Sequence, residues 1–224
     1  VMITAGDLAS LEIETQPTRT IAGENILGSG GAALQVRAID AWTNDIAGAE
    51  ISPSPDGFIF AGPSDPVRTA SNGIASFGTL STSDAGVNYR ISFASGGFST
   101  NSARFNVIPA SPEDLVILQQ PLGGVVGFVL TPNPEVQLTD RFGNPTTSAT
   151  PYHIGVRMIG SEFTDGSTTN VTTGAAGTAT FTDLIPVTNA SRVVLEFDIN
   201  GEPVAMSAPF DIMSTNDFQP DEVR

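Results

Sequence analysis

The chain lacks cysteine and long apolar runs. Without cysteine no disulfide can stabilise it, so each folded part depends on packing, and the redox compartment cannot be inferred from the sequence. The longest apolar stretch, residues 125–130, is far too short to cross a bilayer as a helix. We therefore expect no membrane insertion by this segment.

Lysine is also absent, and all 9 basic residues are arginine. Against them stand 24 acidic residues, which give a formal net charge of −15 and a pI near 4.1. Nucleic acids and anionic membranes are bound through clustered basic side chains, so we expect neither as a partner. The acidic surface favours solubility and repulsion between neighbouring copies, and it is compatible with cation binding.

Side chains suited to catalysis are scarce. The single histidine, His153, follows Tyr152 on a predicted strand, and any Ser-His-Asp triad would have to use it. No Gly-x-Ser-x-Gly motif and no second His or Cys for a zinc site occur. The acids are spread over turns and strands instead of being framed by aromatic residues, as paired glycosidase carboxylates would be. The sequence therefore predicts no enzyme and no catalytic residue.

The chain contains two copies of one module. Residues 73–80 (GIASFGTL) return as 177–184 (GTATFTDL), with Gly, Ala, Phe and Leu in the same places and a period of 104 residues. Residues 11–17 (LEIETQP) return as 115–121 (LVILQQP) with the same period. A repeat of about 100 residues has the size of one small β domain and points to architecture rather than to chemistry.

Short alternating segments separated by turn residues fill each copy. Residues 34–39 (LQVRAI) alternate apolar and polar, as a half-buried strand does, and Asn72-Gly73 is a strong hairpin dipeptide. We expect Pro53 and Pro55 to end a strand that begins near Ala49, and residues 58–60 to form an edge strand. No segment of ten residues has helical periodicity. About seven strands per copy predict an all-β fold of two antiparallel, two-sheet sandwiches. The predicted core of the first copy includes Leu34, Val36, Ile74, Phe77, Leu80, Ile91 and Phe93.

The repeat sets the predicted domain boundaries. Residues 1–7 are an N-terminal linker, 8–108 the first sandwich, 109–114 a linker containing Pro109 and Pro112, 115–212 the second sandwich and 213–224 an acidic C-terminal tail. The two prolines make the central linker semi-rigid. Because the chain begins with Val1 and shows no signal peptide, we expect it to be part of a longer polypeptide.

The order of motifs in the first copy is Leu-x-Ile-x-x-Gln-Pro, a Gly-rich stretch, Val-x-Ala-x-Asp, Gly-x-Ala-x-Phe-x-x-Leu, Tyr-x-Ile-x-Phe and Phe-x-Val. This order resembles the bacterial immunoglobulin-like repeats found in tandem in large secreted and surface proteins, including invasin- and intimin-like adhesins. The resemblance covers both copies, although residues 192–195 (RVVL) replace the Tyr-x-Ile motif in the second. It implies immunoglobulin-like sandwiches of about seven strands and an extracellular or cell-surface location.

The expected function is that of a non-catalytic structural or spacer segment of an adhesin-like or surface-layer protein. Its partners would be neighbouring immunoglobulin-like modules of the same polypeptide. Two alternatives stay open: an accessory module that binds a cell-surface glycan or protein, and a subunit that self-assembles into an extracellular lattice or filament.

Two kinds of binding site are predicted. Trp42, in a polar turn after Asp40, is the best candidate for a ligand contact, with turn packing or a module interface as the competing interpretation. Calcium is the one expected ion, since hard oxygen ligands cluster in turns. The predicted ligands are Asp40, Asn44 and Asp45, together with Glu113 and Asp114 at the module junction. The alternative is that these acids and amides only bond nearby backbone amides.

Overall fold

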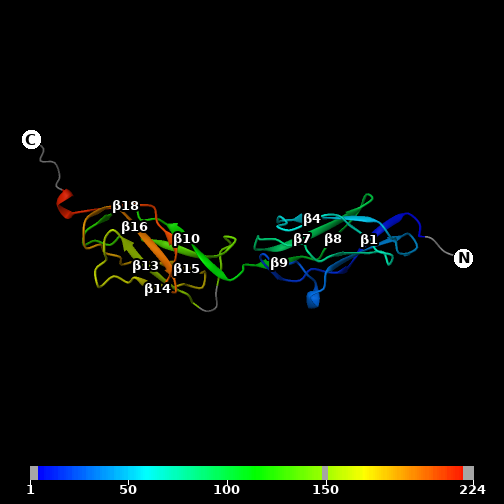
Figure 1. Ribbon diagram of the computed structural model, residues 1–224, viewed down its shortest axis with the longest axis horizontal. Coiled ribbons are helices and arrows are strands. Elements are labelled where there is room, and N and C mark those ends of the chain that lie inside the picture. The colour runs from blue at the N-terminus through cyan, green and yellow to red at the C-terminus, as the bar shows by residue number, and fades with distance from the viewer. Residues whose placement is uncertain (1–4, 148–150, 219–224) are drawn as a thin grey trace, which may run out of the picture. The chain divides into compact units, whose positions relative to one another are not determined.

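The protein forms two compact units, Val1–Ala110 and Ser111–Arg224, each with its own hydrophobic core. The computed structural model describes residues 5–147 and 151–218. Every element of regular structure in these ranges is a strand, apart from two short 3-10 turns, as Figure 1 shows. No helix among the described residues has the length and apolar character needed to span a membrane.

Unit 1 is a sandwich of two sheets. One sheet has the order β1-β3-β6, and the other has the order β2-β9-β7-β4-β5, with β8 also paired to β7. The strands are β1 Leu8–Thr15, β2 Thr20–Ile21, β3 Leu34–Asp40, β4 Glu50–Asp56, β5 Val67–Arg68, β6 Ile74–Phe77, β7 Gly86–Ser95, β8 Phe98–Asn101 and β9 Phe105–Ile108, with the 3-10 turn η1 at Ser29–Gly31.

Unit 2 repeats this topology strand for strand. Its sheets have the orders β10-β12-β15 and β11-β18-β16-β13-β14, with β17 paired to β16. The strands are β10 Pro112–Gln119, β11 Gly124–Val125, β12 Glu135–Asp140, β13 His153–Ile159, β14 Asn170–Thr172, β15 Thr178–Thr180, β16 Ala190–Ile199, β17 Glu202–Met206 and β18 Phe210–Met213, followed by the 3-10 turn η2 at Thr215–Phe218.

In each unit the first strand crosses from one sheet to the other. β1 pairs antiparallel with β3, and after a break at Gln16-Pro17 the chain continues as β2, which pairs parallel with β9. The last strand is also interrupted, between β8 and β9, but both of its parts pair with β7. Counting each interrupted strand once gives seven strands per unit. The predicted all-β fold of two tandem immunoglobulin-like sandwiches is confirmed.

The repeated glutamine and two serines hold these interruptions in place. Gln16 Oε1 accepts a hydrogen bond from Ala103 N at 2.8 Å, and Gln120 Oε1 accepts one from Ala208 N at 3.0 Å. The buried Ser102 Oγ accepts a bond from Ile91 N at 3.0 Å, as Ser207 Oγ does from Leu195 N at 2.8 Å. The Gln-Pro motif is therefore the clamp that joins the two interrupted strands.

Three local predictions were wrong. Pro53 and Pro55 do not end their strand but stay in β4, which pairs with β7 up to Asp56. On the other side β5 reaches only Glu50 and Ile51, and proline is tolerated along an unpaired edge because it has no N–H to donate. Residues 58–60 form no strand, since Phe58 turns inward and stacks on Tyr89 with 4.9 Å between ring centroids.

The third wrong prediction concerns the core. Ile74 is only half-buried, whereas Ala75 and Phe77 point inward. Residues three apart in a strand lie on opposite faces, so Ile74 and Phe77 cannot both face the core. The other six predicted core residues of unit 1 are buried.

The segments between and after the units also differ in extent from the expected ones. Pro112, Glu113 and Asp114, expected in the linker, lie in β10, where Pro112 pairs with Asp140 and Asp114 with Thr139. The last strand of unit 2 extends one residue beyond the expected boundary, to Met213, and η2 lies in the expected tail.

Candidate functional site

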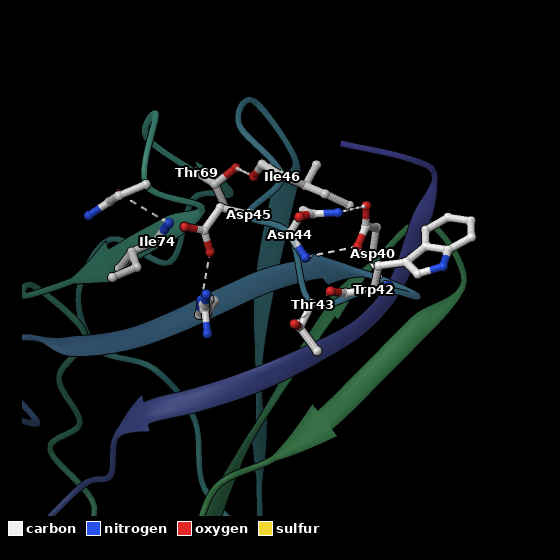
Figure 2. A network of polar contacts seen from close by, with 10 residues as sticks. Asp40, Trp42, Thr43, Asn44, Asp45, Ile46, Thr69 and Ile74 are labelled. Carbon is white, nitrogen blue, oxygen red and sulfur yellow. Dashed lines mark hydrogen bonds and ion pairs between the residues drawn. The ribbon is translucent and has the colours of Figure 1, made fainter. Parts of the chain in front are cut away.

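The turn after β3 is organised by the carboxylate of Asp40. Oδ1 accepts hydrogen bonds from Trp42 N at 2.9 Å and Asn44 N at 2.8 Å, and Oδ2 accepts them from Gly6 N at 2.8 Å and Asn44 Nδ2 at 2.9 Å. Asp40 is 2% exposed. Figure 2 shows the Asp40 and Asn44 side chains facing each other across the turn. The carboxylate thus replaces a backbone acceptor and fixes the loop.

These donors also control the charge of Asp40. The hydrogen bond from the Asn44 amide, followed by that from Gly6 N, holds the pKa of the Asp40 carboxyl well below its usual range, because both stabilise the ionised form. Asp40 therefore carries its negative charge at every pH at which proteins normally work. With two donors on each oxygen, a calcium ion could bind Asp40 only if some of these bonds were broken.

Trp42 projects from the turn with its indole directed away from the hydrogen-bonded network (Figure 2). It is 76% exposed. Only its edge approaches the backbone of Gly6, where an added Cβ would lie 3.3 Å from Cζ3. An exposed indole ring of this kind offers a flat apolar face for stacking against a sugar or an apolar side chain.

Asp45 belongs to a separate contact of the same loop. Its Oδ1 accepts a hydrogen bond from Arg37 Nε at 2.7 Å, and both side chains are about one-third exposed, at 37% and 31%. The ion pair ties the turn to β3. Asp45 thus has a cation partner already, while Asp40 and Asn44 bond to each other.

The remaining predicted calcium ligands lie elsewhere. Glu113 and Asp114 are exposed residues of β10 in unit 2. Within residues 5–147 and 151–218 no group of three or more His, Cys, Asp or Glu side chains has the geometry to hold a metal ion. Calcium binding stays a prediction that the structure does not test.

Unit 2 carries the same turn, with a different aromatic tip. Asp140 Oδ1 accepts bonds from Phe142 N and Asn144 N, both at 2.9 Å, which reproduces the Asp40 cap. Phe142, the counterpart of Trp42, is 40% exposed and has the guanidinium of Arg141 4.7 Å from its ring centroid. This cation–π contact has no equivalent at Trp42 in the sequence, where Ala41 precedes the tryptophan.

The equivalence of Trp42 and Phe142 was missed in the sequence analysis. The signal was present, since Asp-x-aromatic-x-Asn occurs at 40–44 and again at 140–144. Here the period is 100 residues rather than 104, because the chain between the matched segments differs in length. Aligning the copies at their aspartates would have found it.

No protein-family model matches the chain, and no curated protein is significantly similar to it in sequence. Among solved structures, the D0-D1 domains of intimin are 12% identical with a TM-score of 0.33, and the match covers 92% of this chain and 98% of that one. The Escherichia coli adhesin FdeC is 19% identical with a TM-score of 0.45, covering 95% and 67%. Invasin, a bacterial integrin-binding protein, is 13% identical with a TM-score of 0.38, covering 93% and 39%.

Intimin and invasin are the proteins whose repeats the sequence motifs resemble. The chain spans less than half of the invasin structure that it matches. The assignment of each unit as an immunoglobulin-like sandwich rests on its own strand pairing, described above.

Proposed function

We propose that this chain is a non-catalytic structural segment of an extracellular or cell-surface protein, in which two sandwich modules act as a spacer under tension. The observation that carries the proposal is the parallel pairing of the first and last strands in both units. β2 pairs with β9 through Thr20–Val107 and Ile21–Ile108, and β11 pairs with β18 through Gly124–Ile212 and Val125–Met213.

Parallel end strands resist pulling. One bond continues each pairing, from Ala22 N to Ile108 O at 2.9 Å and from Val126 N to Met213 O at 3.0 Å. When the two ends of a unit are pulled apart, the bonded strands must slide along each other. Several hydrogen bonds then have to break together. In an antiparallel pair that is pulled open from one end, the bonds would break one after another. Each unit should therefore stay closed until the force is large enough to break these bonds together.

The polar residues shared by the two copies support the same role. Asp40 and Asp140 cap turns, Ser102 and Ser207 accept buried amide bonds, and the Gln-Pro clamps join the strand breaks. In each of these repeated groups a side-chain oxygen accepts a hydrogen bond from a backbone amide of the fold. His153 lies exposed at the start of β13.

Single-molecule stretching tests the proposal. The chain should open in two separate events, each releasing roughly 35 nm of contour for a unit of about 100 residues at ~3.5 Å per residue. Val126→Pro removes one donor from the strand pairing of unit 2 and should weaken only one of the two events, with unit 1 as the internal control. Opening without measurable resistance, or equal forces in the variant and the parent, would contradict a role under tension.

A second candidate function is an accessory module that binds a cell-surface glycan or protein, and the exposure of Trp42 is what favours it. Binding to a panel of glycans and cell-surface polysaccharides, with and without calcium, tests this role. A hit that disappears in Trp42→Ala but persists in Phe142→Ala would support it. An unchanged affinity in Trp42→Ala would exclude the indole as the contact.

A further inference from the structure

Unit 2 has an apolar groove along β11 and β18. The groove has a volume of about 1080 Å³ and lies at the end of the unit where the last strand finishes. Four of its lining side chains are apolar and well exposed: Leu122 80%, Phe128 62%, Val129 40% and Met213 49%. Arg192 and Asp211 also line it.

The fold does not require apolar residues at Leu122, Phe128 and Val129, because unit 1 supplies a matched control for these three positions. Phe128 N bonds to Val125 O at 3.1 Å just as Glu24 N bonds to Ile21 O at 3.0 Å, so Phe128 occupies the place of Glu24.

The same frame places Val129 where unit 1 has Asn25, and Leu122, four residues before Val126, where unit 1 has Thr18. Both of these unit 1 residues, like Glu24, are exposed. The same backbone positions thus carry polar side chains in unit 1 and apolar side chains in unit 2.

An exposed apolar patch of a few hundred Å² that the fold does not need is characteristic of a contact surface. We propose that the groove of unit 2 receives the Trp42 end of unit 1 from a second copy of this chain. Trp42 is the largest apolar side chain among the highly exposed ones in the described residues, and at 76% exposure most of its surface is not covered by its own unit.

The groove carries one charge of each sign. Asp211 accepts a hydrogen bond from Arg192 N at 2.8 Å, and the Arg192 guanidinium has no ion-pair partner among the described residues. The backbone beside Trp42 continues from Gly6 to the exposed Asp7, whose carboxylate can pair with that guanidinium. The surface around Trp42 and the groove of unit 2 are different surfaces, so the contact is heterologous and can continue from copy to copy. This goes beyond a spacer role, which needs no contact between chains.

The small area predicts a weak contact, since surfaces below about 800 Å² are in the range of crystal contacts. The net charge of −15 opposes association of copies. Salt screens that repulsion, with a Debye length of about 3 Å at 1 M, and leaves the apolar contact in place. Association should therefore strengthen as salt is raised, which is the opposite of an assembly held by ion pairs alone.

Sedimentation equilibrium of the full chain, at concentrations up to about 1 mM chosen because such small surfaces bind weakly, tests the proposal. The average mass should rise above the 23.2 kDa of one chain and continue past the dimer. Trp42→Ala should abolish the rise. The triple change Leu122→Thr, Phe128→Glu and Val129→Asn, which installs the residues of unit 1, should abolish it too. Ile59→Ala removes a side chain that is 73% exposed on a different loop and should leave the rise intact.

A mixture of the two inactive variants is the decisive arm, because one retains the groove and the other retains Trp42. The mixture should form pairs of twice the single-chain mass and nothing larger. Leu122→Thr alone keeps the test interpretable if the triple variant misfolds, as judged by its circular dichroism. A parent chain that stays monomeric, association that survives both variants, or a mixture that forms no pairs would overturn the proposal. A monomeric chain would leave the spacer role intact.

Discussion

Replacing Ser102 by alanine should destabilise unit 1 far more than its position near a strand break suggests. Ser102 is 3% exposed, and its Oγ is the acceptor for Ile91 N at 3.0 Å, in a residue that is itself completely buried. Alanine leaves that amide without a partner and without access to water. A buried donor left unsatisfied costs about 1–3 kcal/mol, and unit stabilities of this size are about 5–15 kcal/mol.

The neighbouring bond between Gln16 and Ala103 separates the effect of burial from the effect of losing a hydrogen bond. Gln16 accepts a bond from Ala103 N, but both residues are exposed. In Gln16→Ala water can replace the lost acceptor, so the cost should stay within about 0.5–1 kcal/mol. Burial of the orphaned amide, rather than the number of bonds lost, decides which variant is more damaging.

Thermal unfolding and urea titration measure both variants. A loss of about 2 kcal/mol should lower the melting temperature of a unit of this size by roughly 8–16 °C. Ser207→Ala should do the same to unit 2 through Leu195 N, and the two losses should add because the units have separate cores. If Ser102→Ala costs no more than Gln16→Ala, the conclusion that burial of the orphaned amide decides the loss of stability is refuted.

Three further predictions concern single residues. Gly177→Ala should lower the free energy of unfolding of unit 2 by more than about 2 kcal/mol, since a positive φ alone costs an L residue about 1–2 kcal/mol and the new Cβ would lie 2.0 Å from Thr146 O. Gly143→Ala, at φ +83 with no neighbour within 4 Å, should cost only the conformational part. Equal losses of stability in urea titration would contradict this reasoning. The pKa of Asp40 is lower in the folded than in the unfolded chain, so its ionised carboxylate stabilises unit 1 fully above the unfolded pKa of about 3.9. This stabilisation is lost as the pH falls toward the folded pKa. Asp40→Asn should therefore make the stability of unit 1 depend less on pH in the acid range, and an unchanged pH dependence would contradict this role of Asp40. For calcium, adding a chelator to the calcium-loaded chain should lower the melting temperature if the predicted ligands bind it, and superimposable melting curves would remove calcium from the description.

Several features of the fold could be predicted because they depend on local periodicity and on the repeat. Leu34 and Val36, or Ile91 and Phe93, alternate with polar neighbours, and this spacing alone assigns them to one face of a strand. The failures came where a partner outside the local segment decided the outcome. Pro53 and Pro55 remain in β4 because one side of that strand is unpaired, which no local pattern reports.

The candidate site was predicted less completely. Trp42 and its turn were found from composition, and the structure shows that the indole is exposed. Its contact with a ligand stays a prediction. For Asp40 the sequence left two interpretations open, a calcium ligand and an acceptor for nearby amides. The structure shows its oxygens bonded to amides of its own loop and of Gly6, 34 residues earlier, and calcium binding stays a prediction. The residues 125–130 were considered only for membrane insertion and dismissed as too short, although Phe128 and Val129 line the groove of unit 2.

The sequence by itself determined that the chain is all-β, that it consists of two equivalent modules, and that it carries a strong net negative charge, because periodicity, repetition and charge are properties of the linear order. Only the tertiary structure decided which repeated polar groups form hydrogen bonds within the fold and which apolar side chains remain exposed to solvent. Hydrogen-bond satisfaction and burial depend on neighbours distant in sequence. For that reason the side chains of Asp40 and Ser102 accept hydrogen bonds from backbone amides of the fold, while the side chains of Trp42 and Phe128 remain exposed.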